Sequence, residues 1–413
     1  MRLESVTIQN IHGFKDEVHI PFSKSKNVII GENGSGKTTL LKILEKILIS
    51  FLSSFEGGSR GDLSMVNPTL TFSINSKIQF KFDKIEKNFI ISKFHENSFY
   101  IRLSYDDVQL GNKILNIKDN SPVFIFINAN LIESDNVEIF SKIPTYKQYT
   151  TQLSISGFNI NEFFAWYDRQ DRILKHEAFV RKDNNYIHKP LQKFNEIMNQ
   201  ILQQLYSLNQ VSLEVKQDDK ENKLVLYLKK NDNFIEFRSL SSGEQRMFSI
   251  IYILISQISE INPKSDSFSE ADGIVMIDEI DSHFHPRWQA IILDILTSAF
   301  PNIQFIVTSH SPYMINNLKQ DEVIYLDNFK YTPSDKLVNI YGRDINFIVK
   351  YLMGVEIRPK AILDQVKKIE ELIDNEKISD AIKELEILKS SLDENDFEVI
   401  RLDTLIQMEN AVH

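Results

Sequence analysis

The segment from Gly31 to Thr39, GENGSGKTT, follows an apolar run and precedes a helical pattern. Because glycine lacks a Cβ atom, the backbone N–H groups of such a loop can converge on phosphate oxygens. The following helix adds partial positive charge at its N-terminus. In the pattern G-x-x-x-x-G-K-[ST], Lys37 reaches the β- and γ-phosphates of a nucleotide and Thr38 binds Mg²⁺. We therefore predict a nucleoside triphosphate site. Further contacts are expected from Asn33, Gly34, Ser35, Gly36 and Thr39.

Two carboxylates, Asp278 and Glu279, directly follow the apolar run 273–277. The run predicts a buried strand, and ligands of open α/β sheets bind at the carboxyl ends of their strands. Asp278 would hold Mg²⁺ through water, and Glu279 would act as the general base on the attacking water. Two surface acids at a strand end are the alternative, which the loop at 31–39 disfavours.

The segment 240–245, LSSGEQ, precedes a helix that we expect to begin near Arg246. Ser241 can cap this helix, and Glu244, three residues on, completes the pattern of a capping box. The functional alternative is a second anion-binding helix terminus, directed at a γ-phosphate.

A polar turn that contains His310 follows a further apolar run, 305–307. His310 could form a hydrogen bond with the γ-phosphate or with the attacking water. A histidine after a strand is more often structural, but its place after the other two motifs favours the functional role.

These segments, in this order, resemble the motifs of the ATP-binding cassette ATPases. The similar branch includes chromosome-maintenance and double-strand-break-repair ATPases, RecF and the OLD-family nucleases. Residues 31–39 match Walker A, residues 274–279 match Walker B, and residues 240–245 resemble the signature, with Ser242 in place of its first glycine. Asp281 matches the D-loop and His310 the switch histidine. The resemblance implies that the chain binds and hydrolyses ATP with Mg²⁺.

The family also implies a composite site, in which the signature of one protomer closes over ATP on Walker A of another. We therefore expect a homodimer or a higher homo-oligomer. The contacts implied outside the first loop are Ser241, Ser242, Gly243, Glu244 and Asp281. Family members also carry a glutamine, the Q-loop, between Walker A and the signature. The candidates here are Gln109, Gln148 and Gln152.

The run 278–289, DEIDSHFHPRWQ, together with 161–167 and 341–346, resembles the PtuA-like ATPase subunit of the Septu anti-phage defence system, also found in retrons. That subunit works with an HNH nuclease. The likeness implies an ATPase that regulates a separate nuclease and meets DNA or RNA through the complex. The chain shows no H-N-H or Toprim pattern of its own. A metal site at His283 and His285 is the less favoured reading of this run.

A RecF-like repair or recombination ATPase that clamps duplex DNA as an ATP-closed dimer is the alternative function. It predicts a basic face, for which the candidates are Lys24, Lys26, Lys81 and Lys84. A transporter subunit is disfavoured, because we find no sign of a membrane partner.

The elements that must position these residues follow from apolar periodicity. Strands are expected over 1–31, antiparallel strands over 69–127, helices over 160–208, strands over 211–238, and alternating helices and strands from 240 to 326. Residues 343–410 have helical spacing and predict three or four helices, with an apolar face that includes Ile362, Val366, Ile369, Leu372, Ile373, Ile382, Leu385 and Leu388.

We predict an α/β fold with the head of an ATP-binding cassette ATPase: a P-loop mixed sheet with helices and an antiparallel β subdomain. This domain would span residues 1–340, with a helical insertion at about 158–208. A helical module would occupy 341–413.

Composition agrees with this assignment. The 413 residues are 42% hydrophobic and 25% charged, which is typical of a globular protein and excludes general disorder. The absence of cysteine excludes disulfides and thiolate metal sites. A net charge of −10 argues against a surface that is basic all over. No leader or membrane-spanning run is apparent, so we expect a cytoplasmic protein.

Overall fold

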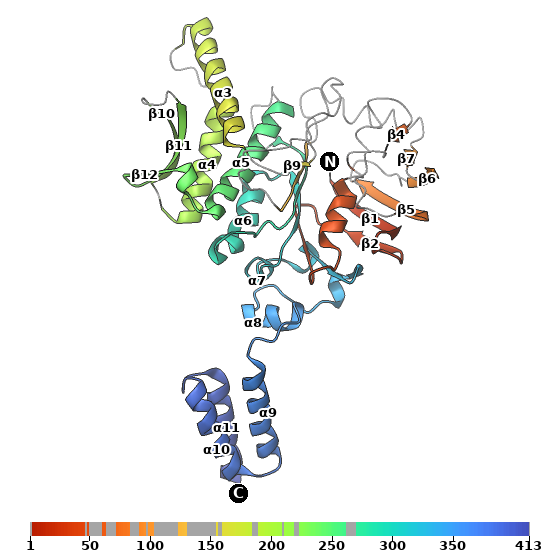
Figure 1. Cartoon of the computed structure of the whole chain (residues 1–413), viewed down its shortest axis with the longest axis vertical. Coiled ribbons are helices and arrows are strands. Elements are labelled where there is room, and N and C mark those ends of the chain that lie inside the picture. The colour runs from red at the N-terminus through yellow and green to blue at the C-terminus, as the bar shows by residue number, and fades with distance from the viewer. Residues whose placement is uncertain are drawn as a thin grey trace. The chain divides into compact units, whose positions relative to one another are not determined.

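The computed structural model describes residues 2–45, 48, 60–62, 72–82, 91–95, 98–102, 123–129, 154–155, 159–183, 189–208, 210–218, 223–261 and 270–412. The chain divides into two compact units, Met1–Arg343 and Asp344–His413. Figure 1 shows the elements of both units. None of the described helices combines the length and the apolar character needed to cross a membrane.

A seven-stranded sheet forms the centre of the first unit, in the order β16-β15-β3-β14-β13-β8-β9. Six strands run parallel, and β16 alone pairs antiparallel with its neighbour. The bounds are β3 Lys26–Ile30, β8 Val123–Ile127, β9 Ser154–Ile155, β13 Gly273–Ile277, β14 Ile303–Thr308, β15 Val323–Asp327 and β16 Lys330–Thr332. Strands β8, β13 and β14 are buried along their whole length, as expected for a parallel sheet covered on both faces.

The expectation of antiparallel structure throughout 69–127 is wrong for its last strand. β8 pairs in parallel with β13 inside the central sheet. Its five residues, VFIFI, form a continuous apolar run instead of an alternating one, which is typical of a strand buried on both faces. The other described strands of this stretch do form antiparallel ladders.

Residues 3–102 contribute two three-stranded antiparallel sheets in addition to β3 of the central sheet. The first has the order β2-β1-β5, in which β1 and β2 pair antiparallel. The second has the order β4-β7-β6. Their bounds are β1 Leu3–Ile11, β2 Val18–Pro21, β5 Phe72–Phe82, β4 Arg60–Asp62, β6 Ile91–His95 and β7 Ser98–Arg102.

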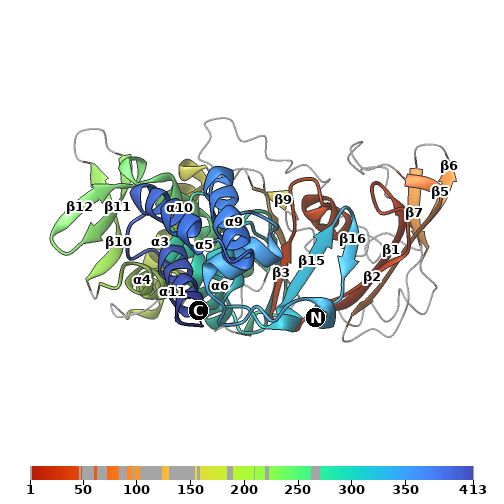
Figure 2. The same cartoon turned by 90° about the horizontal axis from the view of Figure 1, so that it is seen from below.

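Helices α5 (Ser242–Ile261) and α6 (Pro286–Ala299) lie between the central sheet and the helical insertion (Figures 1 and 2). The insertion consists of α3 (Ile160–Arg181) and α4 (Lys189–Tyr206). A further helix begins at Lys37, directly after the glycine-rich loop. The short helical elements of the first unit are η1 Phe237–Ser239, α7 Pro312–Ile315, η3 Gln320–Glu322 and η4 Ser334–Lys336.

Aromatic side chains fix the insertion to α5. Phe163 and Trp166 on α3 are buried, with exposed fractions of 0% and 2%. The ring of Phe163 lies 5.1 Å from that of Phe248 and 5.3 Å from that of Tyr252, both on α5. Edge-on aromatic pairs of this kind stabilise packing beyond the apolar area that they bury. The aromatic residues of 161–167 therefore belong to the core that attaches the insertion.

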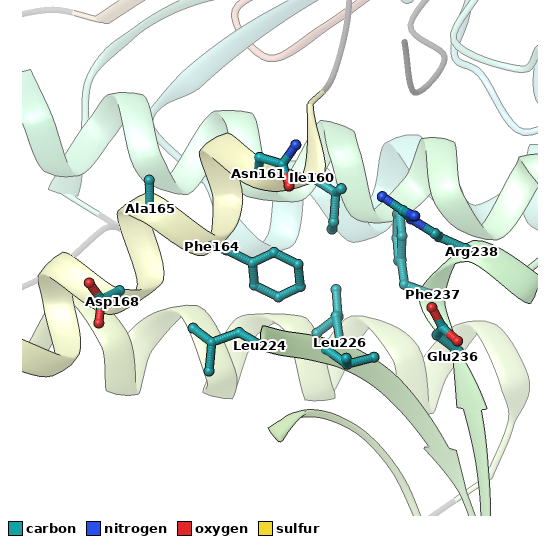
Figure 3. A pocket seen from close by; sticks show the side chains of 11 residues that line it. Ile160, Asn161, Phe164, Ala165, Asp168, Leu224, Leu226, Glu236, Phe237 and Arg238 are labelled. Carbon is teal, nitrogen blue, oxygen red and sulfur yellow. The ribbon is translucent and has the colours of Figure 1, made fainter. Parts of the chain in front are cut away.

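An antiparallel meander follows α4, with the order β10-β11-β12. Its strands are β10 Val211–Asp218, β11 Lys223–Lys230 and β12 Asn233–Glu236. Between α3 and β11 lies a cavity of about 500 Å³, into which Phe164, Leu224 and Leu226 point (Figure 3). Its polar lining includes Asp168, Glu236 and Arg238. The cavity borders η1, which leads into residues 240–245.

The second unit contains three long helices, α9 Lys360–Asp374, α10 Ile378–Ser391 and α11 Phe397–Val412, after the short elements α8 Ile345–Phe347 and η5 Ile348–Leu352. They enclose a core of their own, made of Val366, Ile369, Ile373, Ala381, Leu385, Leu388, Val399, Leu402 and Ile406. Ile382 was expected on this apolar face but is 41% exposed, and Ala381 takes the buried position beside it. Arg358 donates two hydrogen bonds to the Asp396 carboxylate, at 2.8 and 3.0 Å.

Candidate nucleotide site

Three loops with chemically active residues meet at one edge of the central sheet. They follow β3, β14 and β13, which are adjacent and parallel, so that their carboxyl ends lie together. The loops are the phosphate loop (residues 31–39), the histidine turn (309–312) and the acidic turn (278–283). This edge is where open α/β sheets bind ligands.

The phosphate loop depends on its glycines for its backbone path. Gly34 and Gly36 have φ angles of 81° and 106°, a region that favours glycine. A Cβ atom on Gly36 would lie 2.7 Å from the ring of Phe329, whose own N–H donates to Ser35 O at 2.9 Å. The Ser35 hydroxyl is buried and has no hydrogen-bond partner among the described residues. An unsatisfied polar atom in this loop is what a site for phosphate oxygens would contain.

The ammonium group of Lys37 lies within the loop that precedes it. Its Nζ donates to Gly31 O at 2.9 Å and to Glu32 O at 2.8 Å. Burial lowers the pKa of Lys37, while the carboxylates of the acidic turn act in the opposite direction. A buried cation that donates to neutral carbonyl groups is suited to exchanging them for phosphate oxygens.

The carboxylate of Asp278 accepts hydrogen bonds from two hydroxyl groups. Thr308 Oγ1 donates to Asp278 Oδ1 at 2.6 Å, and Thr38 Oγ1 donates to the same oxygen at 3.3 Å. A side-chain hydrogen bond therefore joins the helix that begins at Lys37 to the end of β13. Mg²⁺ prefers a few such oxygen ligands, completed by water and substrate phosphates.

Glu279 has a left-handed backbone, with a φ of 48°. Its N–H donates to Thr308 Oγ1 at 2.7 Å, and its side chain is exposed. A non-glycine residue in this conformation is strained and persists only where its neighbours hold it, often at functional sites. The turn directs the carboxylate of Glu279 away from the core, whereas Asp278 is buried.

His310 and Asp281 are joined at the same edge. The backbone N–H of His310 donates to Asp281 Oδ2 at 3.3 Å. Within the part of the chain that the structure describes, the buried Asp281 Oδ1 has no hydrogen-bond partner. Burial lowers the pKa of His310, and the nearby Lys37 ammonium lowers it further. The carboxylates of Asp281, Glu279 and Asp278 act in the opposite direction, but the net shift favours the neutral imidazole, which has one donor and one acceptor nitrogen.

Residues 240–245 start α5, which begins at Ser242 and not near Arg246 as expected. The predicted capping box is confirmed: the Glu244 N–H donates to Ser241 Oγ at 3.3 Å, and the Ser241 N–H donates to Glu244 Oε2 at 2.9 Å. Both Ser241 and Ser242 are exposed. Gly243 is buried, and a Cβ atom there would lie 2.5 Å from His283 O.

The carboxylate of Glu244 is occupied within the chain. Its Oε1 accepts from Lys230 Nζ at 2.7 Å and from the Tyr206 hydroxyl. Burial acts to raise the pKa of Glu244, but the hydrogen bonds from Lys230, Tyr206 and Ser241 prevail and lower it to about 2. In this structure, Glu244 thus links the signature helix to the insertion and the meander.

Comparison with known families identifies the chain. The family model described as "AAA domain, putative AbiEii toxin, Type IV TA system" matches residues 26–316, which include all the loops above. The chain belongs to this family of AAA-domain ATPases. The prediction of an ATP-hydrolysing enzyme with an α/β P-loop fold is confirmed.

This AAA-domain ATPase is similar over most of its length to curated proteins. It is 22% identical to the Retron Vc95 probable ATPase of Vibrio cholerae serotype O1 biovar El Tor, over 90% of the chain and 84% of that protein. It is 23% identical to the Septu protein PtuA of Bacillus thuringiensis, over 94% and 93% of the two chains. The predicted likeness to the Septu ATPase subunit is confirmed.

Among solved structures, the AAA-domain ATPase is similar to the SMC head in the structure titled "Crystal structure of the SmcHead bound to the C-winged helix domain of ScpA". The TM-score is 0.46 at 16% identity, and the match covers 80% of this chain and 96% of that one.

The candidate residues of the AAA-domain ATPase fall into two groups. The phosphate loop, with Asn33, Gly34 and Thr39, lies at the sheet edge with Asp278, Glu279, Asp281 and His310. Ser241 and Ser242 lie at the start of α5, and among the described residues no hydrogen bond joins them to the phosphate loop. Gln109, Gln148 and Gln152, the Q-loop candidates, lie outside the described residues.

His285, which follows the acidic turn, has a structural role. His285 Nδ1 caps α6 by accepting from the Arg287 N–H at 3.3 Å. Trp288 Nε1 donates to Leu205 O at 3.1 Å and so attaches α6 to the insertion. Within the described ranges, no group of three histidine, aspartate or glutamate side chains is placed to hold a metal ion. The run HPRWQ therefore connects elements of the fold.

Two of the four lysines proposed for a basic face are paired with carboxylates. Lys26 forms an ion pair with Asp294, and Lys81 Nζ lies 2.6 Å from Glu4 Oε2. Lys84 lies outside the described residues. These pairs reduce the positive charge on which direct DNA binding by this face would depend.

Two residues of the site were missed by sequence reasoning, Thr308 and Arg246. Thr308 is the hydroxyl residue that ends the apolar strand β14, and Arg246 is a charged residue at the start of the apolar stretch 247–255. Each is a polar residue beside an apolar run, near one terminus of its helix or strand. This break in the apolar pattern was the signal in the sequence that could have identified them.

Proposed function

We propose that this ATPase closes through composite ATP sites, as a homodimer or a higher homo-oligomer, and regulates a partner nuclease of the HNH type in anti-phage defence. The observation that carries the composite site is that the signature serines are exposed and, among the described residues, form no hydrogen bond with the phosphate loop. Lys37, Asp278 and Glu279 belong to the sheet edge, whereas Ser241 and Ser242 are exposed at a different helix terminus. The names of the Septu and retron relatives support the role in defence.

Each residue at the sheet edge has a role that fits its surroundings. The N–H groups of the phosphate loop and Lys37 Nζ would bind the β- and γ-phosphates. Thr38 and Asp278 would hold Mg²⁺, which when bound neutralises phosphate charge. Glu279 would take the proton of the attacking water, and the neutral His310 would form a hydrogen bond with the γ-phosphate or that water.

The signature would complete the site from a second copy of the chain. The start of α5 presents two exposed serines at the positive end of a 20-residue helix. The capping box holds Ser241, so Ser242 is the freer hydroxyl for a phosphate contact. Gly243 lets the helix start pack directly on the acidic turn of its own chain.

The three-helix second unit is proposed as the docking or assembly module. Its core is complete within the unit, yet apolar side chains remain exposed on its helices. They are Ile382, Ile387, Phe397, Ile400 and Met408, with exposed fractions between 41% and 73%. Apolar side chains exposed on a protein surface are available for contact with another protein. DNA or RNA would be reached through the complex with the nuclease.

Ser242→Arg tests the composite site. The variant should bind ATP as a monomer with the affinity of the wild type, because Ser242 is not part of its own phosphate loop. It should not hydrolyse ATP, because the bulky cation blocks closure onto a second copy. Ser298→Arg, at an exposed serine on α6, is the matched control and should hydrolyse ATP normally. Normal hydrolysis by Ser242→Arg would contradict a role in trans.

A further inference from the structure

Arg246 is buried one turn after the start of α5. Its exposed fraction is 1%, and it is among the largest fully buried side chains of the described chain. Arginine stays charged in proteins and is rarely buried without partners. Among the described residues, the side-chain hydrogen bonds of Arg246 go to three backbone carbonyl groups, those of Ala129, Asp278 and Glu279.

The guanidinium group of Arg246, on α5, donates hydrogen bonds to the backbone of the acidic turn. Nη2 of Arg246 donates to Glu279 O at 2.8 Å and to Asp278 O at 3.2 Å. Nη1 donates to Ala129 O, just beyond the end of β8. The planar fork of arginine suits this task, because it presents several donors in fixed directions.

Glu279 is consequently held at both ends of its backbone. Thr308 accepts from its N–H at 2.7 Å, and Arg246 donates to its carbonyl. The left-handed φ of 48° is unfavourable for a residue with a Cβ atom and requires such restraints. Loss of the contact from α5 would let the turn relax and the carboxylate change direction.

The positive charge of Arg246 also interacts with the carboxylates of this turn. Burial lowers the pKa of its guanidinium, and the carboxylates of Glu279, Asp281 and Asp278 act in the opposite direction. A neutral side chain of similar length would therefore provide neither the hydrogen-bond donors nor a positive charge to balance these three carboxylates.

We propose that Arg246 is a positioning residue for Glu279: it holds the turn that directs this carboxylate and ties the turn to the signature helix α5. The proposal rests on the proposed function, in which Glu279 activates water and Ser242 contacts ATP bound to a second copy. Closure of α5 onto that ATP then acts, through the same helix, on the general base of the chain's own site. The close packing of Gly243 on His283 O provides a second attachment between helix and turn.

Arg246→Met and Arg246→Lys test this role in the full chain. The methionine variant should bind ATP within about threefold of the wild-type affinity, because the hydrogen bonds described for Arg246 go to residues outside the phosphate loop. Its kcat should fall at least tenfold, since a misplacement of about 1 Å can slow an enzyme about 100-fold. The lysine variant should be intermediate, because one ammonium cannot replace the fork. Arg238→Met, at an exposed arginine on η1, is the matched control and should leave kcat unchanged.

A second measurement separates positioning from a general structural effect. If Arg246 acts through Glu279, then adding Arg246→Met to Glu279→Gln should not slow hydrolysis further. A multiplicative loss in the double variant, or wild-type kcat in Arg246→Met, would overturn the proposal. Should the methionine variant fail to fold, an unchanged kcat in Arg246→Lys would overturn it. If Glu279→Gln alone leaves hydrolysis unchanged, the proposed role of Glu279 fails instead.

Discussion

The Thr308 hydroxyl donates a hydrogen bond to Asp278 Oδ1 at 2.6 Å and accepts one from the Glu279 N–H at 2.7 Å. One side chain at the end of β14 thus fixes both carboxylate residues at the end of β13. The two strands are neighbours in parallel register, and this adjacency places the threonine between the residue proposed to hold Mg²⁺ and the proposed general base.

Thr308→Val should lower kcat about tenfold and destabilise the fold. Valine keeps the shape but leaves the Glu279 N–H without an acceptor, and an unsatisfied buried donor costs about 1–3 kcal/mol. ATPase assays and thermal unfolding measure the two effects. Thr297→Val is the matched control, because the Thr297 hydroxyl bonds only to carbonyls of its own helix. Equal effects of both substitutions would contradict the special position of Thr308.

Lys37→Met should weaken ATP binding at least 100-fold, because the phosphates lose the cation buried in their loop. Isothermal titration with ATP and Mg²⁺ measures this loss. Lys42→Met, on the same helix, provides the comparison and should bind ATP normally, since Lys42 lies one turn beyond the phosphate loop. Retention of affinity in Lys37→Met would show that the nucleotide binds elsewhere.

Glu279→Gln should retain ATP binding and reduce kcat by about 10²–10⁴-fold, the range expected for loss of a general base. The slow variant should accumulate in the ATP-closed assembly, which size-exclusion chromatography with light scattering detects. A chain that remains monomeric with ATP would argue against composite sites, and unchanged turnover would remove Glu279 from the chemistry.

Glu244 should make stability depend on pH. Its folded pKa of about 2 lies below the usual 4.5, so its stabilising contribution is present above pH 4.5 and is lost as pH falls towards 2. Glu244→Gln should therefore melt below the wild type at pH 7, and the gap should narrow by pH 3. Calorimetry of both proteins tests this prediction. A gap that is constant across that range would mean that Glu244 is not ionised in the network with Lys230 and Tyr206.

A chain that ends at Arg343 should still bind ATP, because the phosphate loop and its partners all lie in the first unit. The second unit has a core of its own, made of residues from its three long helices. If that unit docks the nuclease, the shortened chain should fail to co-purify with it from the native operon. Intact co-purification would place the docking surface in the first unit.

The candidate nucleotide site could be outlined from the sequence because its motifs are local. The spacing of Gly31, Gly34, Gly36 and Lys37 sets the path of one loop, and a loop of this kind needs few distant contacts to be recognised. The acidic pair, the histidine and the capping box likewise depend on neighbours along the chain. The sequence thus predicted the chemistry and the order of the elements around it.

Only the tertiary structure decided which distant groups act on those motifs. β8 is buried on both faces and pairs in parallel with β13 in the central sheet. Periodicity alone does not distinguish such a strand from other short apolar runs. Glu244 bonds to Lys230 and Tyr206, and Arg246 holds the carbonyl of Glu279, through contacts between residues far apart in sequence. A side chain's type gives its capacity to donate, accept or carry charge, whereas the fold determines the partner on which that capacity is used.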